Sequence, residues 1–311
     1  MSSLLINLVI LVIGFVLLIK GADYFVEGAS STAKRLRVPS IIIGFTIVAM
    51  GTSLPECAVS VTASLSNNNA LAVSNVVGSN IFNLMVVVGT CALMSTLEIK
   101  KETLFKEFPF SVICALLLLV TGYLGMSLGL MDGLIFLVLF ACYMGYMIYS
   151  GLKNRTEEEE IELLPVYKCV LFIVGGAIAI KYGGDFVVDS ASNIASFFGL
   201  SQNLIGLTIV ALGTSLPELV TSIVAARKDE VDMALGNAIG SNIFNILLVL
   251  GVASAISPIA FISENIIDIV ILMIMSLIVW FMSYTSQKLE KKEGFIMILL
   301  YVMYVVYICI R

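Results

Sequence analysis

The residues Gly-Thr-Ser-Leu-Pro-Glu occur twice in this chain, at 51–56 and at 213–218, and each copy lies inside a strongly apolar segment. A carboxylate within a membrane helix costs about 2.5–3.5 kcal/mol on insertion scales, so an acid in such a place usually serves a function. The two acids, Glu56 and Glu218, stand at matching points of the two copies. Carboxylate oxygens are ligands for hard cations, so the pair predicts a cation site.

The residues before each acid are expected to break the helix that carries it. Pro55 cannot donate to the helix ladder, and Gly51 permits unusual backbone angles. A break here frees the carbonyls from Ala49 to Thr52, and a cation can supply the partner that they need in an apolar medium. Pro55 then fits the first turn of a new half-helix, with Thr52 or Ser53 as its cap. The second copy repeats these features with Gly213, Thr214, Ser215, Pro217 and Glu218. An ordinary capped proline kink accounts for one such segment without an acid, but not for both acids.

Two polar stripes accompany the acids. The first has Asn75, Ser79 and Asn83 at i, i+4 and i+8, which places them on one face of a helix. The second repeats this spacing with Asn237, Ser241 and Asn245. We expect the serines and the last asparagine of each stripe to bind a cation, whereas Asn75 and Asn237 could equally hold helices together. Gly78 and Gly240 are expected to let this face approach another helix closely.

The available ligands favour Ca²⁺, with Na⁺ ions as alternative occupants of the same cluster. Two carboxylates, hydroxyl and amide oxygens, and freed carbonyls can complete a shell of six to eight oxygens. The chain has no histidine, and its six cysteines are scattered singly, so soft and borderline metals lack their usual ligands. Mg²⁺ fits less well because it dehydrates reluctantly and demands octahedral geometry.

Composition predicts an all-α integral membrane protein. Of the 311 residues, 59% are hydrophobic and 13% are charged, and apolar runs of about 20 residues recur, which excludes an ordinary soluble domain. The segments predict ten transmembrane helices: 4–33, 39–66, 70–95, 104–122, 128–152, 166–196, 201–226, 232–256, 264–284 and 292–310. The first and sixth are long enough that they should tilt strongly or project beyond the lipid.

The two halves of the chain align without gaps at an offset of 162 residues. Residues 44–56 match residues 206–218 in 11 of 13 positions, and 75–84 match 237–246 in 7 of 10. Five helices separate equivalent positions, so we expect two inverted five-helix repeats, at 1–152 and 166–311, in which helices two and seven are broken. Transporters built this way bind substrate near the midplane, between the repeats. The acidic segment 153–165 is expected to be a linker.

The distribution of lysine and arginine predicts how the protein is oriented in the membrane. Basic residues gather in the odd-numbered loops, whereas even-numbered loops such as 66–69 and 199–203 carry none. The positive-inside rule therefore places the odd loops and the linker in the cytoplasm and both termini outside a cell membrane. Four further acids are matched between the repeats and are expected to be structural, paired with Lys20 or Lys181: Asp23, Glu27, Asp185 and Asp189.

The doubled motifs resemble those of the cation/Ca²⁺ antiporter superfamily, and most closely those of prokaryotic sodium/calcium exchangers. The resemblance rests on GTSLPE paired with GSNIFN in both halves and covers essentially the full chain. It implies four cation subsites in a diamond at the centre. It also implies that the long first and sixth helices slide as a pair over the other eight.

The resemblance also implies a role for each residue. Glu56 and Glu218 would hold Ca²⁺ with the carbonyls of Thr52 and Thr214. The remaining implied ligands are Ser53, Ser215, Ser79 and Ser241 for Na⁺, the carbonyls of Ala49 and Ala211 also for Na⁺, and Asn83 and Asn245 in the middle. Some sodium/calcium exchangers carry Asp where this chain has Asn245. That difference puts the ion ratio and any K⁺ requirement in doubt.

These features predict a secondary antiporter that exchanges Na⁺ for Ca²⁺ by alternating access. The nearest alternative is a Ca²⁺/H⁺ antiporter that uses the same carboxylates, and a passive cation channel is a more distant one. We find no nucleotide-binding loop and no nucleophile–base pair in the sequence, so we do not expect an enzyme. We expect no cofactor, no nucleic-acid partner and no obligatory protein partner. The bilayer and the transported Ca²⁺ and Na⁺ are the expected partners.

Overall fold

The computed structural model describes residues 2–65, 70–154, 163–199 and 211–310, and these form an all-helical membrane protein. Eight of the described helices are long and apolar enough to cross a membrane. A ninth span, Ser40–Thr52 with Leu54–Thr62, is bent by 45° at its break. The predicted seventh helix lies partly outside the described residues, so the count of ten helices stays a prediction.

In the first half, the helices lie where the apolar runs predict them. They are α1 (Ser2–Leu36), α2 (Ser40–Ile43), η1 (Gly44–Val48), α3 (Ala49–Thr52), α4 (Leu54–Leu65), α5 (Ala70–Phe82), η2 (Asn83–Val87), α6 (Val88–Met94), η3 (Thr103–Glu107), α7 (Phe108–Gly125) and α8 (Leu130–Lys153). The segments η1, η2 and η3 are π-helical turns inside longer helices.

The second half repeats most of this order. Its helices are α9 (Val166–Phe197), α11 (Ala211–Gly213), α12 (Leu216–Arg227), α13 (Val231–Phe244), η5 (Asn245–Val249, π-helical), α14 (Leu250–Ile256), α15 (Ser263–Ser286) and α16 (Lys291–Ile310). The expected linker lies between α8 and α9, and residues 155–162 of it fall outside the described residues.

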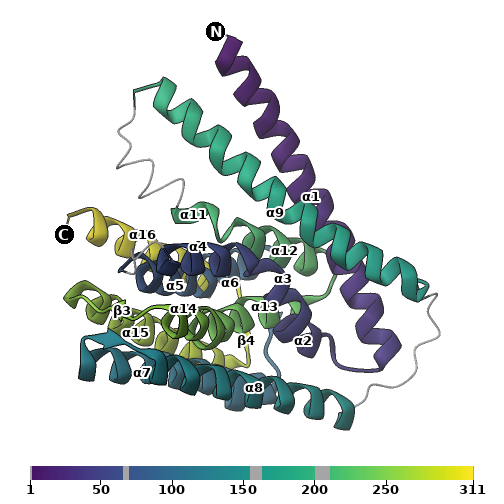
Figure 1. Cartoon of the computed structure of the whole chain (residues 1–311). Helices are drawn as coiled ribbons and strands as arrows, with labels where there is room; N and C mark the ends of the chain where they lie inside the picture. The colour runs from purple at the N-terminus through teal and green to yellow at the C-terminus, as the bar shows by residue number, and fades with distance from the viewer. Residues whose placement is uncertain (1, 66–69, 155–162, 200–210, 311) are drawn as a thin grey trace.

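The two long helices α1 and α9 lie side by side and lean away from the rest of the bundle (Figure 1). They run antiparallel and meet at glycines. A Cβ atom added to Gly21 would lie 2.9 Å from the backbone nitrogen of Ile180, and one added to Gly183 would lie 2.6 Å from that of Leu18. Side-chain atoms are excluded at these points, so the backbones approach as closely as small residues allow in membranes.

Two helical segments form the centre of the bundle. The most apolar windows of Ala72–Met94 and Val231–Ile256 are 78% buried, whereas the corresponding windows of the other membrane-length helices are at most 39% buried. These inner segments are α5–η2–α6 and α13–η5–α14, and they carry the predicted polar stripes. The stripes therefore lie inside the protein, where their polar groups must find partners within it.

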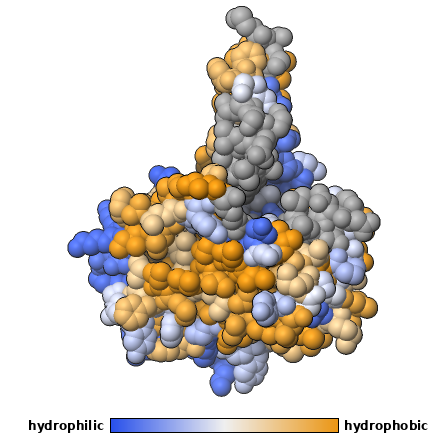
Figure 2. Space-filling model, turned by 90° about the vertical axis from the view of Figure 1, so that its left-hand side faces the viewer, coloured by the Kyte–Doolittle hydropathy of each residue, from blue (hydrophilic) through white to orange (hydrophobic). Residues whose placement is uncertain are grey.

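The outer helices present apolar side chains outward. Exposed leucine, isoleucine, valine and aromatic side chains are spread over α1, α7, α8, α9, α15 and α16. Figure 2 shows such side chains over much of one face of the body, with the column that contains the start of α1 projecting above it. This exposure is what a bilayer requires of the surface that it surrounds.

Two short strand pairs join the ends of the helices. β1 (Leu97–Glu98) pairs with β4 (Lys288–Leu289), and β2 (Ser127–Leu128) pairs with β3 (Ile259–Ala260), both antiparallel. At the offset of 162 residues β1 corresponds to β3, and β2 corresponds to β4 within one residue. Each pair thus joins one strand from each half of the chain, and the two pairs are counterparts of each other.

Candidate cation-binding site

Both motif acids lie in the first turn of a helix that begins just after a break. In the first motif, α3 ends at Thr52 and α4 starts at Leu54. In the second, α11 ends at Gly213 and α12 starts at Leu216. Pro55 has no N–H group, so the carbonyl four residues before it loses its usual helical donor. Glu56 and Glu218 are both completely buried. The break therefore places each carboxylate at the start of a helix, where the helix dipole favours negative charge.

Each carboxylate accepts a hydrogen bond from the serine of the other motif. The Ser53 hydroxyl donates to Oε1 of Glu218 at 2.8 Å, and the Ser215 hydroxyl donates to Oε1 of Glu56 at 3.3 Å. This crossed pairing brings both acids to one place, although 162 residues separate them in the sequence.

Ser215 does not cap its own helix as the sequence suggests. Ser215 occupies the N-cap position of α12, but its side chain makes no capping hydrogen bond. It donates instead to Glu56 and also contacts the Ser79 hydroxyl at 3.1 Å. The Thr52 hydroxyl lies 3.2 Å from the carbonyl oxygen of Val48 and 3.0 Å from Oδ1 of Asn237. The hydroxyls of Ser215 and Thr52 therefore both reach side chains of the opposite half of the chain.

Several buried oxygen atoms around the acids have no hydrogen-bond partner among the described residues. They are Oε2 of Glu56, Oε2 of Glu218, Oδ1 of Asn83, Oδ1 of Asn245, the Ser241 hydroxyl and the Thr214 hydroxyl. An unpaired buried polar group costs about 1–3 kcal/mol, and an unpaired charge costs more. A cation ligated by these oxygens would remove that cost, and the donor set suits Ca²⁺ or Na⁺.

The first asparagines of the two stripes differ in their surroundings. Asn237 is buried, and its amide donates to the Ser222 hydroxyl at 2.9 Å and to the Glu218 carbonyl at 3.3 Å. Asn75 is half-buried, and its amide donates to the Ser60 hydroxyl at 3.4 Å. Asn237 therefore holds α12 and α13 together beside the carboxylate, which is the structural role that the sequence left open.

Asn80 and Asn242 form a symmetric link that the motif spacing did not predict. The Asn80 amide donates to the carbonyl oxygen of Asn242, and the Asn242 amide donates to the carbonyl oxygen of Asn80, both at 3.1 Å. Oδ1 of Asn80 also accepts from the Asn245 amide at 3.2 Å. Both residues lie within the matched GSNIFN motifs, so their doubling was a signal. They stand one residue off the stripe, which is why a search along one helix face passes over them.

One of the predicted carbonyl ligands already accepts a hydrogen bond within its own helix. The carbonyl of Ala49 accepts the Ser53 N–H at 3.1 Å and lies 3.4 Å from the Thr52 hydroxyl, so it is not left without a donor as expected. The reason is that α3 continues to Thr52, which keeps the bond from residue 53 to residue 49 intact. Residues 207–210, ahead of Ala211, fall outside the described part of the chain.

Two other expectations have different outcomes. Gly240 permits close approach, because a Cβ atom there would lie 2.9 Å from Cα of Phe45, whereas the expectation for Gly78 stays a prediction, since a Cβ atom there would meet no described atom within 4 Å. The counterpart of Phe45 would be residue 207, outside the described residues. The acids Asp23 and Glu27 pair with Lys228, at 2.6 and 3.6 Å, rather than with Lys20. Lys181 does pair with Asp185, at 2.6 Å.

A cavity of about 250 Å³ reaches residues of both motifs, Pro55 in the first and Gly213, Thr214 and Pro217 in the second. It lies between α4, α9 and α12, and its lining includes Asp185, Asp189, Thr214 and Pro217. At the counterpart positions of the other half, Ala22, Val26, Thr52 and Thr221 are completely buried, whereas the side chains of Asp23 and Glu27, the counterparts of Asp185 and Asp189, are 37% and 46% exposed. This cavity therefore reaches the motifs from the side of Thr214.

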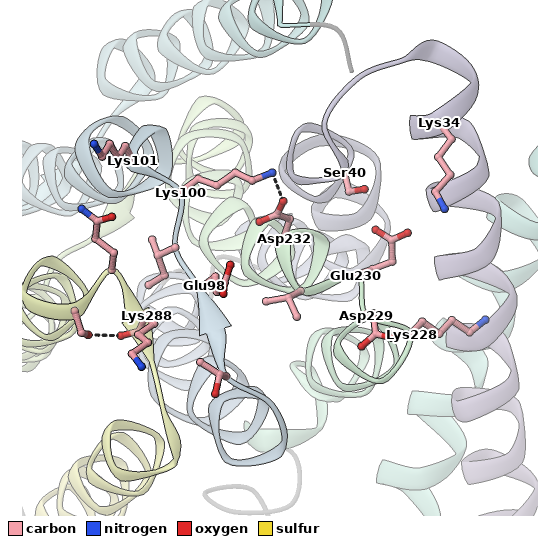
Figure 3. Close-up of a pocket in the computed structure, with 15 residues that line it drawn as sticks. Lys34, Ser40, Glu98, Lys100, Lys101, Lys228, Asp229, Glu230, Asp232 and Lys288 are labelled. Carbon is pink, nitrogen blue, oxygen red and sulfur yellow. Dashed lines mark hydrogen bonds and ion pairs between the residues drawn. The ribbon is translucent and has the colours of Figure 1, made fainter. Parts of the chain in front are cut away.

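A larger cavity, of about 920 Å³, lies at the loops that join α6 to η3 and α12 to α13 (Figure 3). Lysines and acids alternate around it, and Lys100 forms an ion pair with Asp232. At its edge Lys228 reaches toward α1 (Figure 3). Ser30 of α1 donates a hydrogen bond to Glu230 nearby. These contacts join α1 to the C-terminal end of α12, away from the cavity at Thr214.

Among the described residues, no three or more acidic, histidine or cysteine side chains are placed so that they could hold a metal ion together. Two carboxylates with neutral oxygens around them are thus the anionic content of the described centre. Such a centre neutralises one divalent ion, or two monovalent ions, without a thiolate or an imidazole.

Comparison with known proteins agrees with this geometry. Residues 6–149 and 168–310 match the family described as sodium/calcium exchanger protein. The chain is 42% identical over 266 residues to the putative antiporter CaxA of Alkalimonas amylolytica, covering 82% of each. It is 36% identical over 264 residues to the inner membrane protein YrbG of Escherichia coli, covering 80% of this chain and 79% of that protein.

Two further matches are to proteins named as exchangers. The sodium/calcium exchanger MaX1 of Methanosarcina acetivorans is 32% identical over 295 residues, covering 82% of this chain and 84% of that protein. A solved structure of the sodium-calcium exchanger NCX_Mj, soaked with Na⁺ and Sr²⁺, has a TM-score of 0.87 at 30% identity. It covers 97% of this chain and 99% of NCX_Mj.

Proposed function

The chain belongs to the sodium/calcium exchanger family, and we propose that it is a secondary antiporter that exchanges Na⁺ for Ca²⁺ at the buried site between Glu56 and Glu218. The observation that carries the proposal is the crossed pairing of Ser53 with Glu218 and of Ser215 with Glu56. It brings two carboxylates together and leaves one oxygen of each without a partner among the described residues.

The proposed ligands follow from the unpartnered oxygens and from the family. Glu56 and Glu218 would bind Ca²⁺ together with the carbonyls of Thr52 and Thr214. The residues proposed for Na⁺ and for the middle of the site are Ser53, Ser79, Ser215, Ser241, Asn83, Asn245 and the carbonyls of Ala49 and Ala211. Coupling arises because both ions compete for the same two charges, and a site left empty in a low-dielectric medium is costly to move.

Alternating access is supported by the asymmetry between the halves. The cavity at Thr214 gives one side a path toward the centre, and the counterpart residue Thr52 is completely buried, as are Val26 and Thr221 beside it. Two inverted five-helix repeats, 1–152 and 166–311 with a linker at 153–165, would exchange these roles when α1 and α9 move. The paired strands β1–β4 and β2–β3 support such a relation, because each pair is the counterpart of the other.

We also propose that both termini lie outside the cell membrane and that the linker is cytoplasmic. The distribution of lysine and arginine in the loops supports this orientation. A protease site inserted at 155–162 should be cut in inside-out vesicles and protected in right-side-out ones. The reverse pattern would invert the orientation.

Ion flux tests the function directly. Proteoliposomes loaded with Na⁺ should take up Ca²⁺ when external Na⁺ is low, and Glu56→Gln or Glu218→Gln should reduce uptake at least about a hundredfold. Each substitution removes one of the two charges that hold a divalent ion, and breaking a buried charge pair costs about 3–5 kcal/mol. Glu264→Gln is the matched control, since Glu264 is exposed at the start of α15 and should retain normal uptake. Uptake by the unaltered protein that ignores the Na⁺ gradient would reject the coupling.

Exchange of Ca²⁺ for protons is the second candidate. It is favoured by the lack of any described lysine or arginine bonded to Glu56 or Glu218, since an unpaired buried carboxylate can be neutralised by a proton as well as by Na⁺. A pH gradient imposed without Na⁺ separates the two. Ca²⁺ uptake driven by that gradient would assign the protein to proton coupling.

A further inference from the structure

A second cavity lies between the outer helices α7 and α8, apart from the cation site. Its volume is about 360 Å³, and its lining combines Phe110, Leu139 and Cys142 with the polar residues Lys106, Glu107 and Tyr143. The helices that form it are outer ones, with 28% and 22% of their most apolar windows buried. The cavity therefore opens on the surface that faces the lipid.

Two buried polar groups in this cavity have no hydrogen-bond partner in the described part of the chain. Glu107 is 7% exposed and Tyr143 is 6% exposed, and the unpartnered atoms are Oε2 of Glu107 and the Tyr143 hydroxyl. The Tyr143 ring is held by stacking on Phe110, with centroids 5.0 Å apart and planes at 12°. A fixed phenol and an unpaired carboxyl group at an apolar surface call for a ligand that donates hydrogen bonds.

A positive charge stands at the mouth of the same cavity. Lys106 precedes Glu107 in the chain, and its side chain is 51% exposed. Its ion pair with Glu102, at 3.7 Å, is long and lies on the surface, and the ammonium group also interacts with Tyr146, which lines the cavity, so an anion at the rim would join these partners. The cavity thus offers an acceptor pair at its base, a cation at its rim and apolar walls between them.

We propose that this cavity binds the headgroup of an aminophospholipid of the phosphatidylethanolamine type. Its primary ammonium can donate to both Glu107 and Tyr143, and its phosphate can pair with Lys106. The start of an acyl chain would lie against Phe110 and Leu139. A choline headgroup has no N–H group to donate, and a glycerol headgroup has no positive charge for Glu107.

Size and depth agree with this ligand. A volume of about 360 Å³ is near the lower end for small-molecule sites, enough for a headgroup and its first carbons while the chains remain in the bilayer. Glu107 is the fifth residue of the span Thr103–Gly125, which places it about 6 Å from the end of that helix. Lipid headgroups meet a membrane protein at this depth.

A headgroup series tests the proposal on the unaltered protein. Delipidated protein in detergent is given equal amounts of phosphatidylethanolamine, its N-methyl and N,N-dimethyl forms and phosphatidylcholine, all with the same acyl chains, and retained lipid is counted by native mass spectrometry. Retention should fall most steeply once fewer than two N–H groups remain for Glu107 and Tyr143, by at least about tenfold across the series, since one charge-assisted hydrogen bond alone is worth about that factor. Equal retention of the first and last members would overturn the proposal, as would a preference for phosphatidylglycerol.

Two substitutions locate the site. Glu107→Gln should remove the preference for phosphatidylethanolamine, because the amide keeps the shape but not the charge, and Tyr143→Phe should reduce it by a smaller factor. Glu264→Gln, at an exposed acid on another helix, should keep the preference of the unaltered protein. A preference that survives Glu107→Gln in a protein with normal thermal unfolding would place the lipid elsewhere. Failure of this test leaves the flux test of Glu56 and Glu218 untouched, since the two sites share no residue.

Discussion

At the scale of residues, the centre is held together by contacts that cross between the two halves of the chain. The hydroxyl of Ser53 donates a hydrogen bond to Glu218, and that of Ser215 donates one to Glu56. The side-chain amides of Asn80 and Asn242 each donate to the backbone carbonyl oxygen of the other residue. A side chain that bonds across the halves fixes the distance between them and not only its own position. The polar atoms left over are mostly oxygens, which is what a site for a hard cation requires.

Asn80 should contribute to stability rather than to ion binding alone. Asn80→Ala leaves the carbonyl oxygen of Asn242 and the side-chain amide of Asn245 without their partners. Each buried group left unpaired costs about 1–3 kcal/mol of stability. We expect a lower thermal unfolding temperature in detergent without ions. Asn193→Ala serves as the control, because the bond from Asn193 to Asn7 is exposed and 3.4 Å long.

A double substitution sharpens this test. If the two amides act as one link, Asn80→Ala with Asn242→Ala should cost less than the sum of the single changes. An additive result, or an unchanged unfolding temperature for Asn80→Ala, would contradict the role given to this link.

At the scale of elements, breaks and π-helical turns aim the ligands, and glycines set the spacing of the long helices. The π-helical turns η2 and η5 begin at Asn83 and Asn245, so each middle asparagine stands where the helix widens. Such turns inside α-helices are often found at functional sites. The α1–α9 pair is different in kind, since its close approach depends on the absence of side chains.

Two adjacent glycines of α9 provide a matched test of that packing. A Cβ atom on Gly176 would lie 2.8 Å from the carbonyl oxygen of Gly21 and 2.8 Å from Cβ of Phe25, whereas one on Gly175 would meet nothing within 4 Å. Gly176→Ala should therefore separate α1 from α9, with a loss of about 1–3 kcal/mol from overpacking. Gly175→Ala should be neutral or slightly stabilising, because alanine favours a helix.

Thermal unfolding and Ca²⁺ flux measure both variants. The packing account requires a lower unfolding temperature and a slower flux for Gly176→Ala alone. Similar behaviour of the two variants would show that the contact between the long helices is not limiting.

At the scale of the whole molecule, the two sides of the centre are unequal. One side has the cavity that reaches Thr214, and on the other side Lys228 joins the end of α12 to Asp23 and Glu27 of α1 (Figure 3). Lys181, in contrast, pairs with Asp185 of its own helix. An ion pair between two elements can hold a passage closed, whereas one within a helix cannot.

Lys228→Gln should therefore favour opening of the closed side. The side chains of Lys228 and Asp23 are 32% and 37% exposed, so the pair is worth about 0.2–1 kcal/mol, a shift of up to about fivefold in population. Ala22→Cys, in a background without the six native cysteines, reports the opening by its rate of reaction with an impermeant thiol reagent. Labelling should accelerate with Lys228→Gln and not with Lys181→Gln. Equal labelling rates in all three proteins would show that the ion pair between Lys228 and Asp23 does not hold this side closed.

Much of this protein could be predicted from its sequence alone. Apolar runs set the positions of the helices, because a bilayer rewards such runs directly. The repeated GTSLPE motif identified Glu56 and Glu218, since an acid in an apolar segment is costly and is retained where it serves a function. The absence of histidine and the scattered cysteines limited the cation to a hard one.

Contacts between the halves could be decided only by the tertiary structure. Local rules assign Ser53 and Ser215 to caps, yet both hydroxyls donate to the carboxylate of the opposite motif, because a buried anion needs hydrogen-bond donors and a bond to a charged acceptor is stronger than one between neutral groups. In the same way Lys228 pairs with Asp23, 205 residues away, and Asn80 pairs with Asn242. Periodicity reports which face of a helix is polar, but which partner that face meets depends on how the whole chain packs.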